Sequence, residues 1–376
     1  MSDRRGVKDE DQPLSWLPET WAERLSQMGA PAYRGRQAFE WIWRHDARTY
    51  DDIGVWPKGL RQRMAERYPL RRVSEIRVRR GSDGTTKLLL NLADGERVET
   101  VLLPHDYGTS VCVSSQVGCN MGCTFCASGL LGRVRNLTAG EIMDQVAAAS
   151  ATHRAAGGGA VHRIDLMGIG EPLDNYDQVV RFCRLAHAAL GLNLGYRHIT
   201  LSTSGVVPAI YRLADERLPI TLAVSLHAPN DALRLRLMPI NRAYPLARLI
   251  PAARYYFEQT GRRVSFEYAM LRDVNDGPAT ARELVDLLTA TPMAWHVNLI
   301  PWNPVPEQAY EPSPMAEVRS FRDLVQQHGI SCTIRRELGQ DIDAACGQLR
   351  HREEADRRPS RIRRNPPRSS AGGQSG

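Results

Sequence analysis

The chain has 376 residues, of which 42% are apolar, so it can bury the cores of one large domain and a smaller one. Its net charge is +7, and three of its seven cysteines lie within eight residues, which excludes the disulfide framework of a small secreted protein. The N-terminus has no apolar signal core, and no run approaches the roughly 20 apolar residues of a membrane span. We therefore expect a cytoplasmic protein with reduced thiols and no membrane partner.

The first part of the chain predicts helices and then short strands. Residues 1–12 are polar, and we expect them to be loose. Over residues 13–71, apolar side chains recur at helical spacing in "RQAFEWIWRH" and "GLRQRMAERY", which predicts a small helical accessory domain. From residue 72, "RRVSEIRVRR" and "TTKLLLNLADGERVETVLLP" contain strand-like runs joined by glycine turns, so we expect a strand extension in front of the main domain.

A regular alternation of strands and helices follows. The strand-like segments, in chain order, are "SVCVS", "HRIDLMGIG", "RHITLSTSG", "ITLAVSLHA", "RVSFEYAML", "WHVNLIPWNP" and "ISCTIRREL". Helical patterns lie between them, and the first, "TAGEIMDQVAAASATH", has Thr138 as its N-cap. Such alternation predicts a parallel sheet with right-handed crossovers. Six or seven units are fewer than the eight of a closed barrel, so residues 72–349 are predicted to form an α/β partial barrel of (β/α)6 type. Its functional site should lie at the carboxyl ends of the strands.

Residues 350–376 differ in composition from the rest of the chain. They hold eight arginines and three acidic residues, together with Pro, Ser and Gly. This composition predicts a disordered tail. Its positive charge suits the phosphate backbone of a nucleic acid, and the alternative is a solvated terminus that only keeps the protein in solution.

Three cysteines lie on one predicted loop directly after the first barrel strand. Cys119, Cys123 and Cys126 have the spacing C-x3-C-x2-C, and thiolates suit iron–sulfur clusters or zinc. Structural zinc usually takes four protein ligands, and no second C-x2-C pair occurs in the sequence. The run therefore favours a [4Fe–4S] cluster with one iron left open, and its spacing is typical of the radical S-adenosylmethionine (SAM) superfamily. A zinc site that borrows a distant ligand is the alternative.

Glycines and small polar residues end the strands that follow. The segments are "MGIGEP", "STSG", "SLH" and "PWNP". Glycine lets a backbone approach a ligand closely, and the carboxylate of Glu171 can pair with an ammonium group. Each segment alone is most simply a turn or a cap, and His227 alone is a hydrogen-bonded histidine at a strand end. Together they predict a polar ring around one pocket.

Several longer motifs, in a fixed order, are similar to those of the RlmN/Cfr family of radical SAM RNA methyltransferases. They are "CVSSQVGCNMGCTFC", "RNLTAGEI", "GIGEPLDNY", "STSGVVP", "SLHAPND", "PINRAYP", "FEYAML", "VNLIPWNP" and "DIDAACGQL". The similarity extends over residues 34–349. It implies a radical SAM barrel and an N-terminal helical domain, residues 13–71, that contacts RNA. The arginine-rich tail lies outside it.

The resemblance implies a ping-pong reaction that runs through cysteine. Cys346 takes a methyl group from a first SAM. A second SAM, bound at the cluster of the cysteine run, is cleaved to a radical that activates this methyl group for addition to adenine. Glu99 accepts the ring proton, and Cys112 attacks the sulfur of Cys346 to leave a transient disulfide. Without the resemblance, Cys112 is a core residue and Glu99 a surface carboxylate. The implied SAM contacts are Gly170, Glu171, Ser202, Ser225, Leu226, His227 and Asn303.

The resemblance also implies substrates and partners. Relatives methylate C2 or C8 of adenine, and "GIGEPLDNY" with "STSGVVP" favours C2. The implied substrates are an adenosine of 23S rRNA in the peptidyl-transferase region and the adenosine 3′ of the tRNA anticodon. We further expect a [4Fe–4S] cluster in each subunit, two SAM molecules per turnover, an electron donor such as flavodoxin, and a monomer. The alternatives are Cfr-like methylation at C8 and a zinc-containing RNA-binding protein without catalytic activity.

Overall fold

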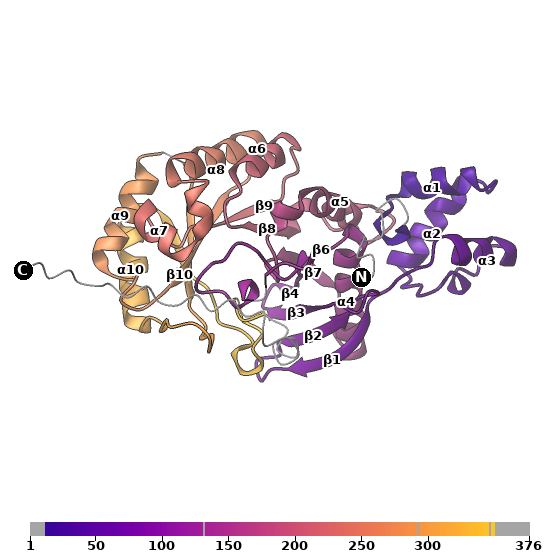
Figure 1. Cartoon of the computed structure of the whole chain (residues 1–376), viewed down its shortest axis with the longest axis horizontal. Helices are drawn as coiled ribbons and strands as arrows, with labels where there is room; N and C mark the ends of the chain where they lie inside the picture. The colour runs from indigo at the N-terminus through magenta and orange to yellow at the C-terminus, as the bar shows by residue number, and fades with distance from the viewer. Residues whose placement is uncertain (1–11, 131, 292, 346, 350–376) are drawn as a thin grey trace, which may run out of the picture.

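The computed structural model describes residues 12–349 except 131, 292 and 346 (Figure 1). Three predictions therefore fall outside the described residues: most of the loose start, the disordered tail at 350–376, and the methyl-carrier role of Cys346. Within the described residues, a group of helices occupies one end of the molecule, and a large sheet with its own helices occupies the rest (Figure 1).

The N-terminal part is helical, as its apolar spacing predicts. Its elements are η2 (Pro13–Ser15), α1 (Pro18–Gln27), α2 (Tyr33–Trp43), η3 (Tyr50–Asp52) and α3 (Lys58–Arg67). Trp21 of α1 is fully buried, and its ring lies edge-on to those of Trp16 and Trp56, with centroids 4.9 and 6.4 Å away. These helices thus share an aromatic core. The hydroxyl of Ser15 accepts a hydrogen bond from the backbone N–H of Gly140 (2.9 Å), which joins this part to the barrel.

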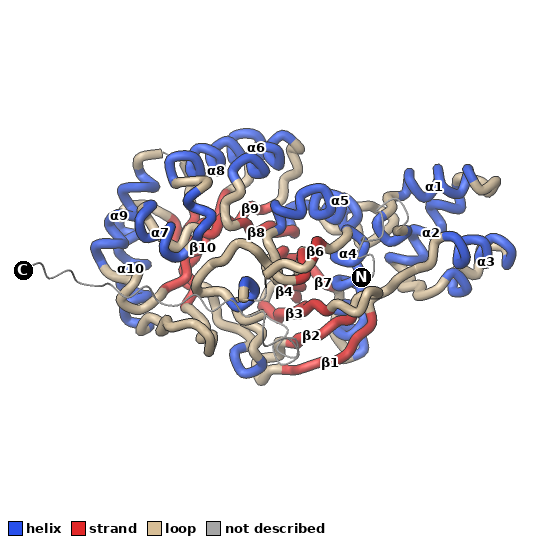
Figure 2. Tube along the Cα trace, in the orientation of Figure 1, coloured by secondary structure: helices blue, strands red, loops and turns tan. Residues whose placement is uncertain are grey.

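One sheet runs through the rest of the described chain (Figure 2). Its strands are β1 (Ser74–Arg80), β2 (Thr86–Asn91), β3 (Arg97–His105), β4 (Gly108–Cys112), β7 (Val161–Leu166), β8 (Ile199–Thr203), β9 (Thr221–Ser225), β10 (Val264–Met270), β11 (His296–Pro301) and β12 (Ser331–Ile334). They neighbour one another in this order. The strands β1 to β4 pair antiparallel, while β4 and the strands after it pair in parallel.

Helices connect the parallel strands and cover them from outside (Figure 2). They are α4 (Ala139–Ala155), α5 (Tyr176–His187), α6 (Val207–Asp215), α7 (Asp231–Leu237), α8 (Leu246–Thr260), α9 (Pro278–Thr289) and α10 (Met315–Gln327). The predicted N-cap of α4 is confirmed. The hydroxyl of Thr138 accepts from the N–H of Glu141 (3.2 Å), and the Glu141 carboxylate accepts from the N–H of Thr138 (2.9 Å).

The parallel strands form a barrel that stays open. In the described part of the chain, β12 pairs with β11 alone, and β4 pairs with β7 and the antiparallel β3, so the first and last parallel strands do not meet. This confirms the predicted α/β partial barrel. The sequence did not reveal α7 or the short pair β5 (Gln116–Val117) and β6 (Arg135–Asn136), because each is too short for a clear periodic pattern.

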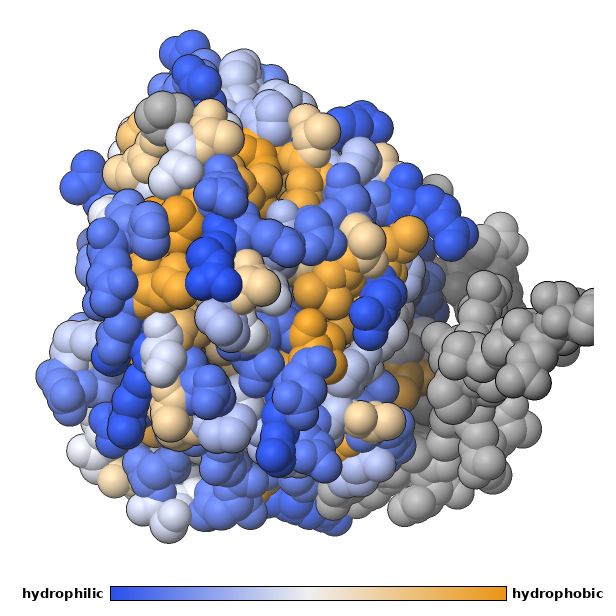
Figure 3. Space-filling view, turned by 90° about the vertical axis from the view of Figure 1, so that its left-hand side faces the viewer, coloured by the Kyte–Doolittle hydropathy of each residue, from blue (hydrophilic) through white to orange (hydrophobic). Residues whose placement is uncertain are grey.

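The buried apolar side chains of the main core fill the space between the sheet and its helices. On the face shown in Figure 3, the remaining apolar side chains lie in separate patches between hydrophilic ones. No helix among the described residues has the length and apolar character needed to cross a membrane.

Candidate active site

The cysteine run forms a tight loop between β5 and the short helix η4 (Ala127–Gly129). Cys119 is buried, and Cys123 and Cys126 are partly buried. Gly118 has a φ of +73°, and a Cβ there would collide with the carbonyl oxygen of Gly132. The turn before the first cysteine therefore requires glycine.

Two neighbouring elements hold the cysteine loop at the carboxyl end of the barrel. The backbone N–H of Thr124 donates to the carbonyl of Leu237, the last residue of α7 (3.0 Å). The indole N–H of Trp302, just after β11, donates to the carbonyl of Phe125 (3.0 Å). The loop therefore lies at the end of the strands where a barrel of this kind carries its functional site.

The three thiols suit an iron–sulfur cluster. Burial raises the pKa of Cys119 to about 12, so this thiol ionises at neutral pH only when a cation binds it. Among the residues that the structure describes, no three His, Cys, Asp or Glu side chains are placed to hold one metal ion, as a zinc site requires. An iron–sulfur cluster binds its thiolates through different irons, so they need not converge on one point. Three thiols on one loop thus fit a [4Fe–4S] cluster.

A buried carboxylate follows the second parallel strand. Glu171 accepts hydrogen bonds from the backbone N–H groups of Leu173 (3.0 Å) and Ser204 (2.7 Å), and burial raises its pKa. Its own N–H donates to the side chain of Gln116 (2.9 Å). Gly170 has a φ of +109°, and a Cβ there would lie 2.6 Å from the Cβ of Gln116. Glycine is thus required beside a carboxylate that can pair with an ammonium group.

A buried arginine ties together the carboxyl ends of β8 and β9. Arg234 of α7 is completely buried, and its guanidinium donates to the carbonyls of Ser204 (2.8 Å), Ser225 (3.1 Å) and Leu226 (3.2 Å). Burial lowers its pKa to about 10, so it stays charged at neutral pH. Ser202 lies two residues after Thr200 on β8 and therefore on the strand face that Thr200 presents to the central cavity.

His227 occupies a constrained backbone position after β9. Its φ is +55°, and its Nδ1 accepts from the backbone N–H of Ala269 (2.8 Å), so the ring proton lies on Nε2. Burial and then the charge of Arg234 lower its pKa to about 3, which keeps the ring neutral. The ring of Phe125, from the cysteine loop, lies edge-on at 4.6 Å. His227 is therefore a neutral N–H donor beside the cysteine loop.

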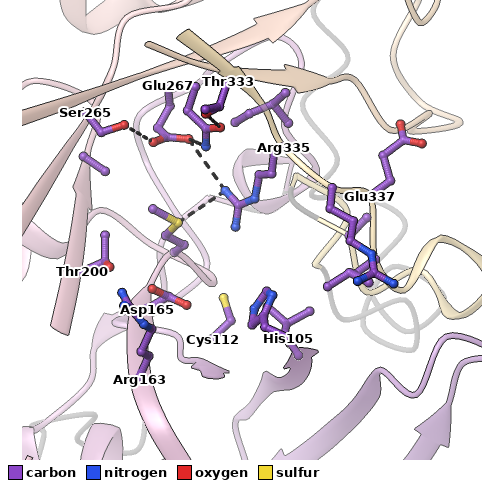
Figure 4. Close-up of a pocket in the computed structure, with 18 of the residues that line it drawn as sticks. His105, Cys112, Arg163, Asp165, Thr200, Ser265, Glu267, Thr333, Arg335 and Glu337 are labelled. Carbon is purple, nitrogen blue, oxygen red and sulfur yellow. Dashed lines mark hydrogen bonds and ion pairs between the residues drawn. The ribbon is translucent and has the colours of Figure 1, made fainter. Parts of the chain in front are cut away.

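A cavity of about 600 Å³ runs down the inside of the barrel (Figure 4). Of the predicted site residues, Cys112 and Asn303 line it. In Figure 4 the sulfur of Cys112 points into the open space between Asp165 and His105. The opposite wall carries Glu267, which is buried and accepts a hydrogen bond from Asn298 (2.8 Å). The other predicted SAM contacts are not among the residues that line it.

Residues on both sides of Cys346 share an apolar cluster with Cys112. Cys112 belongs to a small apolar cluster with Val101, Ala344 and Leu349. Ala344 lies two residues before Cys346 and Leu349 three residues after it. Although Cys346 lies outside the described residues, residues on both sides of it in the sequence therefore belong to the same apolar cluster as Cys112.

Hydrogen bonds fix the same segment to the cysteine loop. The N–H of Ala127 donates to the carbonyl of Gly347 (2.8 Å), and the hydroxyl of Ser128 donates to the carbonyl of Leu349 (3.0 Å). On the other side, Gln340 donates to the side chain of Asn303 (3.0 Å). The segment 339–349 thus bridges the cysteine loop and the end of β11.

Glu99 is buried on β3, with 6% of its surface exposed. The interpretation of Glu99 as a surface carboxylate is therefore wrong. Its carboxylate forms an ion pair with Lys87 of β2, at 3.1 Å. Sequence reasoning missed Lys87 and Arg234, although each is a charged residue among leucines, in "TTKLLLNL" and "DALRLRLMP". A lone charge in an apolar stretch is the signal that could have found Lys87, whereas nothing in the sequence separates the buried Arg234 from the exposed Arg236.

The chain is similar to known proteins over most of its length. Residues 113–285 match the Radical SAM superfamily. A protein of Symbiobacterium thermophilum named "Probable dual-specificity RNA methyltransferase RlmN" is 49% identical over 344 residues, which cover 91% of this chain and 92% of the relative. A protein of the same name from Desulforudis audaxviator is 53% identical over 315 residues, covering 83% and 97%. The crystal structure of a radical SAM methyltransferase from Sphaerobacter thermophilus is 46% identical, with a TM-score of 0.86, and covers 90% of this chain and 99% of that one.

Proposed function

Because the chain belongs to the RlmN family of radical SAM RNA methyltransferases, we propose that it methylates C2 of one adenosine in the peptidyl-transferase region of 23S rRNA and C2 of the adenosine 3′ of the tRNA anticodon. The observation that carries the proposal is the position of Cys112 in the cavity wall, in one apolar cluster with Ala344 and Leu349. A reaction that passes through two cysteines requires one thiol in the cavity wall, close to the segment that carries the other.

The cofactors are a [4Fe–4S] cluster in each subunit and two SAM molecules per turnover. Cys119, Cys123 and Cys126 hold the cluster, as their loop and their burial support. When bound, the cluster supplies the electron that cleaves SAM to a 5′-deoxyadenosyl radical. The residues that hold SAM are Gly170, Glu171, Ser202, Ser225, Leu226, His227 and Asn303.

The chain's own residues carry the methyl group and the proton. The Cys346 thiol accepts a methyl group from the first SAM and later presents this carbon to adenine. Glu99 accepts the ring proton. The Cys112 thiolate then attacks the sulfur of Cys346, so that a sulfur–sulfur bond forms as the carbon–sulfur bond to the RNA breaks, and the released carbon takes a proton to become the new methyl group. An electron donor of the flavodoxin class reduces the cluster, and a dithiol reductant returns the disulfide to two thiols for the next turnover.

The proposed RNA contact involves the N-terminal helices. They stand apart from the barrel (Figure 1), and α3 exposes Lys58, Arg63 and Arg67 to solvent. Such exposed cations suit a phosphate backbone. We place the reaction in the cytoplasm, in a monomer.

Mass spectrometry of nucleosides tests the proposal. The protein is reconstituted with iron and sulfide without oxygen and incubated with SAM, reductant, and either a 23S rRNA fragment or tRNA. We expect 2-methyladenosine from both RNAs. Formation of 8-methyladenosine instead would assign the Cfr-like activity. Binding of zinc with no uptake of iron would leave a non-catalytic RNA-binding protein.

A further inference from the structure

Lys87 connects two parts of the proposed reaction that lie far apart in the sequence. Its Nζ is 3.1 Å from a carboxylate oxygen of Glu99 and donates to the backbone carbonyl of Asp343 at 2.9 Å. The side chains of Lys87 and Glu99 are only 9% and 7% exposed. Asp343 lies three residues before Cys346. One ammonium group therefore contacts both the proposed proton acceptor and the segment of the proposed methyl carrier.

Strand register directs these groups to the same side of the sheet. Lys87 of β2 lies opposite Val101 of β3, and Val101 lies opposite Cys112 of β4. Glu99 is two residues from Val101 on the same strand, so Lys87 and Glu99 are diagonal neighbours on one face. Cys112 faces the cavity from that same face. The proton acceptor, its cation and the proposed resolving thiol thus share the inner surface of the barrel.

The turn between β1 and β2 holds the carrier segment by other contacts as well. The N–H of Ser82 donates to the carboxylate of Asp341 (2.8 Å), and the carboxylate of Asp83 accepts from the N–H of Gly339 (2.7 Å). These contacts dock the segment without touching Glu99. Lys87 differs from them because it also reaches the proton acceptor.

A buried carboxylate is costly unless a cation or hydrogen bonds compensate its charge. In the ion pair, the ammonium of Lys87 stabilises the charged form of Glu99, which is the form that can accept a proton. A second N–H of the same ammonium binds the Asp343 carbonyl, so the carboxylate and the carrier segment keep a fixed separation.

We propose that Lys87 is a positioning residue that keeps Glu99 charged and sets it at a fixed distance from the segment that carries Cys346. This inference rests on the proposed function, because it takes Glu99 as the proton acceptor and Cys346 as the carrier.

The test separates methyl loading from adduct release in the reconstituted full-length enzyme. The variants are Lys87→Met, Glu99→Gln and, as a matched control that contacts the same segment from the turn before β2, Asp83→Ala. Methyl loading on Cys346 is read from the intact protein mass, and the covalent RNA–protein adduct from a denaturing gel. We expect Lys87→Met to load methyl within about threefold of wild type while turnover falls about 100-fold and the adduct accumulates, as for Glu99→Gln. Asp83→Ala should lower loading and turnover together, without adduct.

Each other outcome has a definite meaning. If Lys87→Met lowers loading as much as turnover and traps no adduct, Lys87 only docks the segment and the inference is wrong. If Glu99→Gln turns over normally, the proposed role of Glu99 fails, whatever Lys87→Met does. Should Lys87→Met not fold, the double variant Lys87→Met/Glu99→Gln also removes the buried charge that Lys87 contacts. The double variant should trap as much adduct as Glu99→Gln alone. A further loss of turnover of about 100-fold relative to Glu99→Gln would show that Lys87 and Glu99 act independently, and it would refute the inference.

Discussion

Replacing Arg234 with methionine removes the guanidinium that joins the carboxyl ends of β8 and β9. In the structure, this side chain donates to five oxygen atoms at distances between 2.8 and 3.5 Å, four backbone carbonyls and the amide oxygen of Asn241. It is completely buried, so water does not replace the lost donors. Methionine fills most of the same space, and the loss is therefore mainly one of hydrogen bonds.

The size of the effect follows from these contacts. A hydrogen bond to a charged group contributes about 1.5–3 kcal/mol net. Removing the buried charge of Arg234 also removes the cost of burying it, which offsets part of the loss. We therefore expect the free energy of unfolding to fall by about 3–5 kcal/mol.

Urea unfolding followed by circular dichroism measures this change. With a slope of about 3 kcal/mol per molar urea, the midpoint should fall by about 1 M or more. Arg236→Met is the matched control, because Arg236 is exposed on the same helix. Its free energy of unfolding should change by no more than about 0.5 kcal/mol. Equal midpoints for the two variants would show that the Arg234 hydrogen bonds do not stabilise these strand ends.

Two further predictions concern the site. Cys112→Ala should load methyl on Cys346 like wild type, release less than about 1% of the normal methylated RNA and leave a covalent adduct on a denaturing gel, because no thiol frees the product. Free methylated RNA at the normal rate would contradict that role. The folded-state pKa of His227 is about 3, far below its unfolded value, so stability should decrease as pH falls. When the pH is lowered from about 6.5 to 5.5, the free energy of unfolding measured with urea should fall by about 1 kcal/mol more for wild type than for His227→Asn. Equal decreases for the two proteins would contradict the buried neutral ring.

Much of the fold could be predicted because short stretches of sequence indicate the individual strands and helices. The alternation of strand and helix segments gave the partial barrel, and the capping box at Thr138 gave the start of α4. The helix α7 could not be predicted in this way. Its seven residues are too few to show a period, and the burial of Arg234 is decided by strand ends that lie elsewhere in the chain.

The site could be predicted only in part, because a sequence motif indicates which residues act but not which other residues they contact in the fold. The cysteine spacing indicated a cluster, and the structure gives a loop that fits one. The ion pair between Lys87 and Glu99 depends on the register of two antiparallel strands, and the contact of Lys87 with Asp343 joins residues 256 positions apart. Local patterns carry no information on such pairings. The roles of Glu99, Cys112 and the SAM contacts stay predictions.

The contacts of the segment 339–349 affect the order in which the chain can fold during its synthesis. Its contacts with Ser82, Asp83 and Lys87 span between 256 and 259 residues of chain. Closing so long a loop costs entropy that only the folded barrel between its ends can offset. During synthesis the N-terminal helices, the strands and the cysteine loop emerge first, and the carrier segment comes last. A nascent or truncated chain can therefore fold most of the barrel and still lack the segment that completes the proposed pair of thiols.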